Sequence, residues 1–488
     1  MVYEAEGPVS ESNADGGRIV ILGASGVIGR ELVALCTALG RPYLAISSWD
    51  IDLSGPGAAE ALGARLAPAD SIVLLAAVPP DIDRGAAGLL RNAEIARATA
   101  AAARRADIRH LLYLSSDGVY SAQDGAVTET SPVAASDCYR AGHLAREAIV
   151  RADFLPERLC IVRATQIYSR HDSHFAYGPC RFARDLAAGR RIALFGAGEE
   201  RRDHMSAEDL VRIVLDLSDQ GACGTVNAAT GRSVSFAELA QRMLSLVGRD
   251  SEEVSSVPRR QPLFHRDFDI ARLTALLGPF QFEPLERGLA RLLVAARSRQ
   301  EPMAGARPAV FLDRDGVLNE NLVVDGKPYA PRRFQDFRLY PEAATAIVKF
   351  KAAGFATVVV TNQPDLGHGL IEPSQLQAMH AYLERETGVD AILTCPHRQD
   401  EGCGCRKPGA GLLVRAAYTH NLDLSRSVMV GDRASDVAAG RDAGCRTIFI
   451  DRAFRETRSM PKADIVVGGD EGLDAAAEII LRDVAREP

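Results

Sequence analysis

Two aspartates, Asp313 and Asp315, form the pair of side chains in this chain with the clearest potential for chemistry. They follow a short apolar run at 309–312, which predicts a buried parallel strand ending just before them. At a strand end, one carboxylate can attack phosphorus while its neighbour moves protons. Taken alone, the pair fits a solvated loop equally well.

Three later segments add the other groups that phosphoryl transfer requires. They are 358–363, an apolar run that ends in Thr361 and Asn362; 405–408, which carries Arg406 and Lys407; and 428–436, an apolar run followed by Asp432. Because ligands of open parallel sheets bind where the strands release their loops, we expect these segments to converge. The combined set suits phosphoryl transfer, which depends on positioning and charge neutralisation.

In motif order and spacing, residues 309–480 resemble the haloacid dehalogenase (HAD) superfamily of phosphatases. The resemblance implies that Asp313 is the nucleophile that forms an aspartyl-phosphate. It implies that Asp315 protonates the leaving oxygen and then activates water, and that Thr361 and Lys407 hold the phosphoryl oxygens. Mg²⁺ would be bound by Asp313, the Asp315 carbonyl and Asp432, a short ligand list that fits this ion. The expected substrate contacts are Asn362 and Arg406.

A polar loop just before Arg406 carries four residues that can bind zinc, namely Cys395, His397, Cys403 and Cys405. Three thiolates and one imidazole make a closed tetrahedral set, typical of structural zinc. Ordinary buried cysteines are the alternative, which so polar a loop disfavours. The motif resembles the branch of D-glycero-D-manno-heptose 1,7-bisphosphate 7-phosphatases and histidinol phosphatases. The short spacer between His397 and Cys403 leaves the exact substrate open.

Composition restricts the classes of function. The chain is 47% hydrophobic and 25% charged, as in ordinary soluble proteins. A net charge of −7 argues against nucleic acid as a partner, and no apolar run reaches the ~18–20 residues that span a bilayer. Nine cysteines, three of them in the zinc loop, suit a reducing cytoplasm. We therefore expect a cytoplasmic enzyme that acts on small anionic substrates.

A length of 488 residues predicts two or three domains. The stretch 297–308 combines Pro, Gly and charge without apolar periodicity, which indicates a linker. We expect a disordered tail at 1–17, a first domain at 18–296 and a second domain at 309–488.

The first domain begins with an apolar strand at 18–22, followed by Gly23, Gly26 and Gly29. Glycines at this spacing let the backbone approach a pyrophosphate, and the helix that follows favours its charge. Further apolar runs at 71–77 and 110–116 alternate with helical stretches. Both halves of the chain are therefore predicted to be α/β, each with a doubly wound, Rossmann-like parallel sheet.

Residues 18–295 resemble the extended short-chain dehydrogenase/reductase (SDR) family, which includes nucleotide-sugar epimerases and dehydratases. The resemblance implies that Ser116 and Tyr139 polarise a substrate alcohol or carbonyl, that Arg202 contacts the nucleotide diphosphate, and that the protein forms a homodimer. The expected NAD or NADP contacts are Gly23, Ser25, Gly26, Val27, Ile28, Gly29, Asp52, Leu53, Ala76, Ala77 and His143. The choice between the two cofactors stays open, because neither an acidic residue nor an arginine ends the second strand.

One departure concerns the family's Tyr-x-x-x-Lys, which here reads Tyr139 to His143. The lysine holds the nicotinamide ribose and lowers the pKa of the tyrosine, whereas histidine is mostly neutral at pH 7. The first domain therefore either keeps a slower or different redox reaction or binds ligands without turnover.

The resulting hypothesis is a bifunctional enzyme of an activated-sugar pathway. It joins a Mg²⁺-dependent sugar-phosphate phosphatase, with heptose bisphosphate as the model substrate, to a nucleotide-sugar epimerase, reductase or dehydratase. One alternative is a phosphatase regulated by a nucleotide-binding domain that lacks turnover. Another is a histidinol-phosphate phosphatase.

Overall fold

The computed structural model describes residues 17–79, 82–172, 178–250, 253–259, 262–300, 305–324, 326–453 and 462–484. These residues form two compact units. The first contains the described residues before 178 with Phe195–Phe236 and Pro258–Glu283, and the second contains Gly178–Leu194, Ala237–Val257 and the chain from Pro284 onward. The tail expected at 1–17 lies, apart from Gly17, outside the described residues. The domain boundaries that the sequence predicts, at 296 and 309, stay predictions of where one independently folding domain ends and the next begins.

The first unit is built on a six-stranded parallel sheet in the order β2-β1-β3-β4-β5-β9. Its strands are β1 (Ile19–Leu22), β2 (Tyr43–Ile46), β3 (Ser71–Leu74), β4 (His110–Ser116), β5 (Leu159–Ala164) and β9 (Gly224–Ala228). A small second sheet has the order β10-β8-β6, with β6 at Gln166–Tyr168, β8 at Arg201–Ser206 and β10 at Ser233–Ser235.

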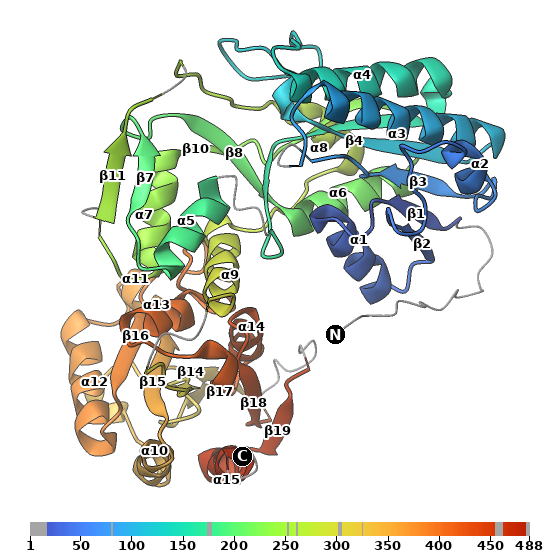
Figure 1. Cartoon of the computed structure of the whole chain (residues 1–488). Coiled ribbons are helices and arrows are strands. Elements are labelled where there is room, and N and C mark those ends of the chain that lie inside the picture. Colours follow the sequence, from blue (N-terminus) through green and yellow to red (C-terminus); the bar gives the residue numbers. More distant parts are fainter. Residues whose placement is uncertain are drawn as a thin grey trace. The chain divides into compact units, whose positions relative to one another are not determined.

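Helices cover both faces of this sheet (Figure 1). One apolar core joins it to α1 (Val27–Ala38), α6 (Ala207–Asp219) and α8 (Ala271–Leu277). The opposite core joins it to α2 (Ala58–Gly63), α3 (Ala86–Arg105) and α4 (Cys138–Asp153). Strands such as β1 and β3 are buried along their whole length, which explains their unbroken apolar sequences.

The second unit contains another six-stranded parallel sheet, in the order β16-β15-β12-β17-β18-β19. Its strands are β12 (Ala309–Leu312), β15 (Ala356–Asn362), β16 (Ala391–Cys395), β17 (Val428–Gly431), β18 (Arg446–Asp451) and β19 (Ile465–Gly468). A hairpin of β13 (Leu322–Val324) and β14 (Lys327–Tyr329) follows β12, and the short helix α11 (Pro364–Gly367) follows β15.

One face of the second sheet packs on α10 (Ala343–Ala352), α12 (Pro373–Thr387) and α15 (Gly472–Val484). The helices α13 (Gly411–Thr419) and α14 (Ala434–Asp442) contact the strands from the opposite side (Figure 1). The predicted doubly wound α/β fold is therefore confirmed for both sheets.

The second unit also includes a group of elements from earlier in the chain, which we call the lobe. The lobe consists of α5 (Gly178–Ala187), β7 (Ile192–Phe195), α7 (Phe236–Leu246), β11 (Val254–Val257) and α9 (Leu285–Ser298). Strands β7 and β11 pair with each other, and α9 packs on both α5 and α13.

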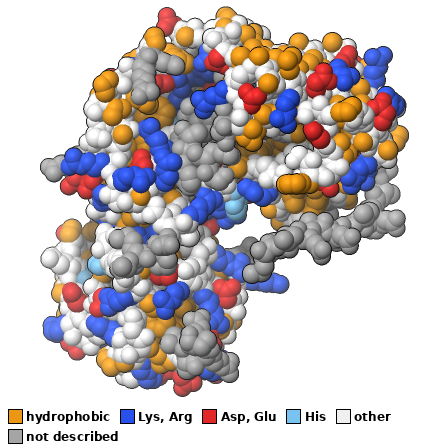
Figure 2. Space-filling view, in the orientation of Figure 1, with side chains coloured by type: hydrophobic (Ala, Val, Ile, Leu, Met, Phe, Trp, Pro, Cys, Tyr) orange, Lys and Arg blue, Asp and Glu red, His pale blue; other side chains and the backbone are white. Residues whose placement is uncertain are grey.

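Acidic and basic side chains are interspersed over the face of the molecule in Figure 2. Among the described helices, none combines the length and the apolar character that crossing a membrane requires.

Candidate active sites

The predicted phosphatase residues meet at the carboxyl edge of the second sheet. Because β12 pairs with both β15 and β17, the loops that follow these three strands are neighbours. Lys407, from the loop before α13, reaches them: its Nζ lies 2.8 Å from Asp313 Oδ1 and 2.6 Å from Asp436 Oδ1. The same Nζ donates to the Val360 carbonyl at 2.7 Å. Residues far apart in the sequence thus share one buried centre.

Three carboxylates, those of Asp313, Asp432 and Asp436, each place an oxygen within 4.8 Å of the other two. Burial raises the pKa of Asp313 to about 6; Lys407 opposes this shift, while Asp436 and Asp315 add to it. Burial and the charges of Asp313 and Asp436 also raise the pKa of Asp432 well above its usual value. The three carboxylates therefore carry more negative charge than Lys407 alone balances.

The donor set fits a divalent cation. Asp432 Oδ1 is buried and has no hydrogen-bond partner among the described residues, and the same holds for Asn321 Oδ1. Unpaired buried oxygens of this kind are costly unless a cation or water binds them. Carboxylate and amide oxygens are the ligands that Mg²⁺ prefers. Asp313 and Asp432 can therefore hold a Mg²⁺ ion, as the sequence predicts.

Asp315 is held in a different environment. Its carboxylate accepts hydrogen bonds from Arg314 Nη2 at 2.9 and 3.0 Å, from Asn319 Nδ2 at 3.0 Å and from Gln363 Nε2 at 2.7 Å. Burial raises the pKa of Asp315, but the charge of Arg314 and these hydrogen bonds more than offset it and hold the pKa below its usual value. Asp315 is therefore a carboxylate here.

Two further residues, Arg314 and Gln363, contact Asp315 although the sequence motifs give them no role in the site. Arg314 is fully buried, so its charge acts on Asp315 at close range. Gln363 bridges Asp315 to the Thr361 hydroxyl, to which it donates at 2.9 Å. An arginine between two aspartates reads as a surface residue, and only the path of the loop after β12 shows that it turns inward.

A cavity of about 550 Å³ opens onto this centre. The predicted residues on its wall are Asp313, Asp315, Asn362, Arg406 and Lys407, and further cations on the wall are Lys327, Arg332 and Arg433. Asn362 uses its amide to hold the backbone of Lys407, with Nδ2 donating to the carbonyl at 3.0 Å and Oδ1 accepting from the N–H at 3.1 Å. Thr361 is buried behind Gln363. The wall also carries Asp365, which pairs with Arg332, and Asp436, which pairs with Lys407. Several cations on one wall suit an anionic substrate.

The four predicted zinc ligands form a compact cluster. Cys395 Sγ lies 3.5 Å from His397 Nδ1 and 3.6 Å from Cys403 Sγ. Cys405 Sγ lies 3.2 Å from His397 Nδ1 and 3.7 Å from Cys403 Sγ. Tetrahedral zinc with bonds of about 2.0–2.3 Å holds its ligand atoms roughly 3.5–3.8 Å apart. A hydrogen bond with Cys405 is the main reason that the pKa of Cys395 falls to about 5. Burial raises the pKa of Cys403, and the hydrogen bond with Cys395 raises that of Cys405.

In the first unit, the glycine loop has the geometry predicted for a phosphate site. Gly23 has a φ of +93°, and a Cβ there would lie 2.6 Å from the Ala76 nitrogen. A Cβ on Gly29 would lie 2.2 Å from the Gly23 carbonyl oxygen. Helix α1 starts after Gly26, and no side chain caps it, so the N–H groups of Val27 and Ile28 are available to an anion.

The remaining predicted cofactor contacts of the first unit are more dispersed. Ser25 is exposed beside Gly26. Asp52 Oδ1 accepts from the backbone and hydroxyl of Ser54 at 3.0 and 2.7 Å, which holds its pKa below the usual value. Leu53 is buried in the apolar core on the α2 and α3 side. Their contact with an adenine ring remains a prediction.

A second cavity, of about 490 Å³, contains the predicted hydroxyl pair. Ser116, Tyr139, His143, Ala77 and Arg202 all lie on its wall. Ser116 Oγ accepts from the Gly118 N–H at 3.0 Å, and the Tyr139 ring packs so closely over Gly118 that a Cβ there would be 3.3 Å from it. Arg202 donates to the Phe264 carbonyl at 2.9 Å and pairs with Glu200. Its predicted contact with a diphosphate is untested.

His143 is neutral in this cavity. Its Nδ1 lies 2.8 Å from the Tyr113 hydroxyl, and its ring lies 4.8 Å from that of Tyr139. Burial, assisted by the charge of Arg146, lowers the pKa of His143 to about 3. The positive charge that the family's lysine would supply is therefore absent from this position.

Arg146, which the sequence analysis did not single out, brings a cation to the same cavity. It follows His143 by one turn of α4 and lines the cavity, and its Nη2 donates to the Ala76 carbonyl at 2.5 Å. Its guanidinium lies 4.7 Å from the centre of the Tyr113 ring, and among the described residues no carboxylate pairs with it. Positions i and i+7 share a helix face, so its spacing from Tyr139 was the available signal.

Comparison with known proteins identifies two families in the chain. The profile of the NAD dependent epimerase/dehydratase family matches residues 19–229, and a HAD-hydrolase-like profile matches residues 404–468. The D-glycero-beta-D-manno-heptose-1,7-bisphosphate 7-phosphatase of Bordetella bronchiseptica is 36% identical over 183 residues, which are 36% of this chain and 98% of that protein. The corresponding enzyme of Thermosynechococcus vestitus is 37% identical over 164 residues, covering 30% of this chain and 81% of that protein.

Solved structures resemble the first half. The structure of MoeE5 in complex with UDP-glucose and NAD is 21% identical, with a TM-score of 0.51, and the match covers 58% of this chain and 99% of that one. DesIV, a dTDP-glucose 4,6-dehydratase from Streptomyces venezuelae with NAD and TYD bound, is 21% identical, with a TM-score of 0.51 and coverage of 58% and 97%. At this identity the likeness concerns the fold. Both family resemblances predicted from the sequence are confirmed.

Proposed function

Because this chain belongs to the family of HAD-type heptose-bisphosphate 7-phosphatases and carries an NAD-dependent epimerase/dehydratase domain, we propose that it is a bifunctional enzyme of sugar-nucleotide metabolism. The observation that carries the phosphatase assignment is the buried centre of Asp313, Lys407 and Asp432 beside a cation-lined cavity. Its substrate is a sugar phosphate, and heptose 1,7-bisphosphate is the first candidate because the similar proteins are named for it.

In the first step, a carboxylate oxygen of Asp313 attacks phosphorus and the bond from phosphorus to the sugar oxygen breaks. Asp315 protonates the departing oxygen. It carries that proton because a bound phosphate dianion next to it raises its pKa, so that Asp315 takes up a proton from water before this step. Water then attacks the phosphorus of the aspartyl-phosphate while Asp315, again a carboxylate, takes the proton. The bond to Asp313 breaks, and inorganic phosphate leaves.

Lys407 neutralises charge on the phosphoryl group while its neighbours hold it in place. Asp313 and Asp436 raise the pKa of Lys407 despite its burial, so it stays a cation. A Mg²⁺ ion held by Asp313, Asp432 and the Asp315 carbonyl would supply further positive charge when bound. Thr361 is assigned to a phosphoryl oxygen, and Asn362 and Arg406 to the substrate. The four-residue Cys/His cluster is assigned to structural zinc.

For the first domain we propose an NAD- or NADP-dependent reaction on a nucleotide sugar, as epimerase, reductase or dehydratase. Gly23 to Gly29 would hold the cofactor's diphosphate, and Ser116 and Tyr139 would move the proton. Arg146 supports turnover, since it places a cation on the wall of the cavity, one helical turn from the neutral imidazole of His143.

A second candidate function is a nucleotide-binding domain that regulates the phosphatase without turnover. The neutral His143 favours this alternative. Titration with NADH, NADPH and nucleotide sugars distinguishes the two functions. Redox turnover supports the enzyme, whereas binding that changes only the phosphatase rate supports regulation.

The decisive experiment for the phosphatase is a screen of the purified protein against sugar mono- and bisphosphates, with phosphate release measured in the presence of Mg²⁺. Heptose 1,7-bisphosphate should give the highest kcat/KM, and histidinol phosphate should be a poor substrate. A preference for histidinol phosphate would replace the proposed substrate. A homodimer and a cytoplasmic location are part of the proposal, and analytical ultracentrifugation tests the dimer.

A further inference from the structure

The zinc loop of the phosphatase lies against two helices of the lobe. Gly404, between the ligands Cys403 and Cys405, is so close to them that a Cβ would lie 2.6 Å from the Glu286 Cβ of α9. The same atom would lie 3.0 Å from Leu246 Cδ2 at the end of α7. Since real Cβ atoms do not approach a neighbour within 3.0 Å, the contact leaves no room for a methyl group.

Ion pairs hold these two helices in place. Arg242 of α7 donates through Nη1 to Glu286 Oε1 at 2.7 Å, which joins α7 to α9 beside the loop. The next residue of α9, Arg287, donates through Nε and Nη2 to Asp442 Oδ2 of α14 at 2.9 and 2.8 Å. The start of α9 is therefore fixed both to the lobe and to the helix that follows Asp432.

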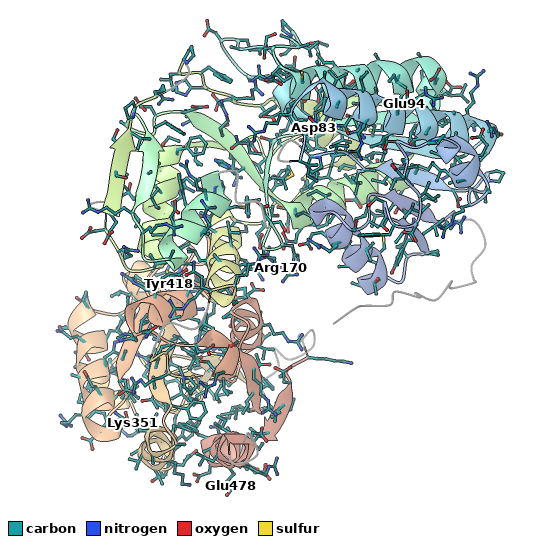
Figure 3. The ribbon with its side chains drawn as sticks, viewed as in Figure 1. Asp83, Glu94, Arg170, Lys351, Tyr418 and Glu478 are labelled. Atoms are coloured by element: carbon teal, nitrogen blue, oxygen red, sulfur yellow. The ribbon has the colours of Figure 1, made fainter. Side chains whose placement is uncertain are left out.

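The far end of α9 is fixed to α13. The guanidinium of Arg297 lies 4.9 Å from the centre of the Tyr418 ring, and the Tyr418 hydroxyl donates to the Leu293 carbonyl at 3.3 Å. Tyr418, labelled in Figure 3, lies next to α9. These contacts hold α9 at both ends, so the helix can support the loop that packs against its start.

The supported loop leads directly to the catalytic lysine. Cys405 is followed by Arg406 and Lys407, and the Lys407 Nζ contacts Asp313 at 2.8 Å. Close packing continues along this path, because a Cβ on Gly411 would lie 2.0 Å from the Gly404 carbonyl oxygen. A shift of the zinc loop would therefore move Lys407, and small displacements of catalytic groups are costly.

The similar phosphatases are too short to contain such a support. The relative from Bordetella bronchiseptica consists almost entirely of the matched 183 residues, which are 36% of this chain. The lobe is encoded before residue 299, ahead of the first phosphatase motif at Asp313. Its contact with the zinc loop is thus an addition made by the fusion.

We propose that the lobe braces the zinc loop: Glu286, held by Arg242, fixes the backbone at Gly404 and thereby positions the zinc ligands and Lys407. Glu286 and Arg242 act as positioning residues and touch neither metal nor substrate. The effect on catalysis rests on the proposed phosphatase function, whereas the effect on zinc retention does not.

The test uses full-length Gly404→Ala, Glu286→Gly and the double variant. Gly404 has a backbone conformation that other residues adopt, so the added methyl is penalised by its neighbours alone. Overpacking of this kind is expected to speed zinc transfer to a coloured chelator by about tenfold in Gly404→Ala. It should also lower kcat more than it changes KM. Glu286→Gly removes the side chain that holds the loop, so this variant should also lose zinc faster than the parent. Because the opposing Cβ is then gone, the added methyl of the double variant should cause no further zinc loss beyond that of Glu286→Gly alone.

A matched pair of arginine variants extends the test. Arg242→Ala releases Glu286 and should speed zinc loss, whereas Arg249→Ala removes the ion pair with Glu253 and should not. Unchanged zinc retention in Gly404→Ala or in Glu286→Gly, a double variant that loses zinc faster than either single variant, or a parent protein that holds no zinc would each overturn the proposal. If zinc retention follows the expected order while no variant or parent releases phosphate, the brace stands and the proposed function fails.

Discussion

Replacing Asp432 by asparagine should stabilise the Mg²⁺-free protein even though it abolishes the proposed metal site. Asp432, Asp313 and Asp436 place oxygens within 4.8 Å of one another, and Lys407 pairs with the latter two. At that separation, two like charges repel by about 3 kcal/mol at an effective dielectric constant of about 20. Arg433 and Lys407 attract Asp432 and offset much of the two repulsions, whereas burial of the Asp432 charge adds to its cost.

Proton uptake reduces the gain further. Burial and the neighbouring carboxylates already raise the pKa of Asp432, so part of the population relieves the repulsion by binding a proton. We therefore expect Asp432→Asn to gain about 1–2 kcal/mol at pH 7.5 without Mg²⁺. This corresponds to a rise in melting temperature of about 3–6 °C for a unit of this size.

The assay is thermal unfolding of parent and variant with and without Mg²⁺, in buffer without chelator so that zinc is retained. A saturating cation at about 100 times its Kd should stabilise the parent by roughly 2.7 kcal/mol and the variant far less, which reverses their order. Asp474→Asn is the control, because this exposed aspartate lies on α15, where it pairs with Lys349. A variant that melts below the parent without Mg²⁺, or that gains as much from Mg²⁺, would refute the assigned charge distribution.

Four further predictions follow from the two sites. Asp313→Asn should lower phosphate release by at least about 10⁴-fold, whereas Asp365→Asn on the cavity wall should retain most activity; comparable losses would contradict the nucleophile assignment. The free energy of unfolding of the Mg²⁺-free protein should fall as pH rises from about 4 through 6. The reason is that the raised pKa of Asp313, about 6, makes the folded state bind the proton more tightly than the unfolded state. Urea unfolding at pH 5 and pH 8 measures the direction of this change, and Mg²⁺ should reduce the difference between the two pH values. Arg146→Gln should weaken binding of NADH or NADPH about tenfold by calorimetry, with Arg151→Gln, more exposed on the same helix, as the control; equal affinities would remove Arg146 from the cofactor site. Cys403→Ser should release zinc and lower the melting temperature, whereas Cys223→Ser, an exposed cysteine of the first unit, should do neither.

The sequence predicted that the candidate phosphatase residues lie close together, because strand-end motifs of a parallel sheet converge by geometry. Asp313, Thr361 and Asp432 each end or follow an apolar run, and the pairing of β12 with β15 and β17 is sufficient to bring them together. The grouping of the four proposed zinc ligands could also be predicted, because all four lie close together in the sequence, in one short loop.

Groups that depend on side-chain direction or distant packing were not predictable. The sequence suggests that Arg314 is a surface residue, but the path of the loop after β12 buries its side chain against Asp315. The spacing of Arg146 from Tyr139 places both on one face of α4, but this spacing does not show that the Arg146 side chain reaches the Ala76 carbonyl. The contact of Glu286 with Gly404 joins segments more than a hundred residues apart, and apolar periodicity carries no information about which helices meet.

The most direct test of the central claim is a search for the phosphorylated enzyme during turnover. The protein is mixed with heptose 1,7-bisphosphate and Mg²⁺, quenched in acid within one turnover, digested, and analysed by mass spectrometry. If Asp313 is the nucleophile, the peptide that contains it should carry one added phosphoryl group, and the same peptide of Asp313→Asn should carry none. Phosphate release by the parent with no modification at Asp313, or with modification at another residue, would contradict this assignment.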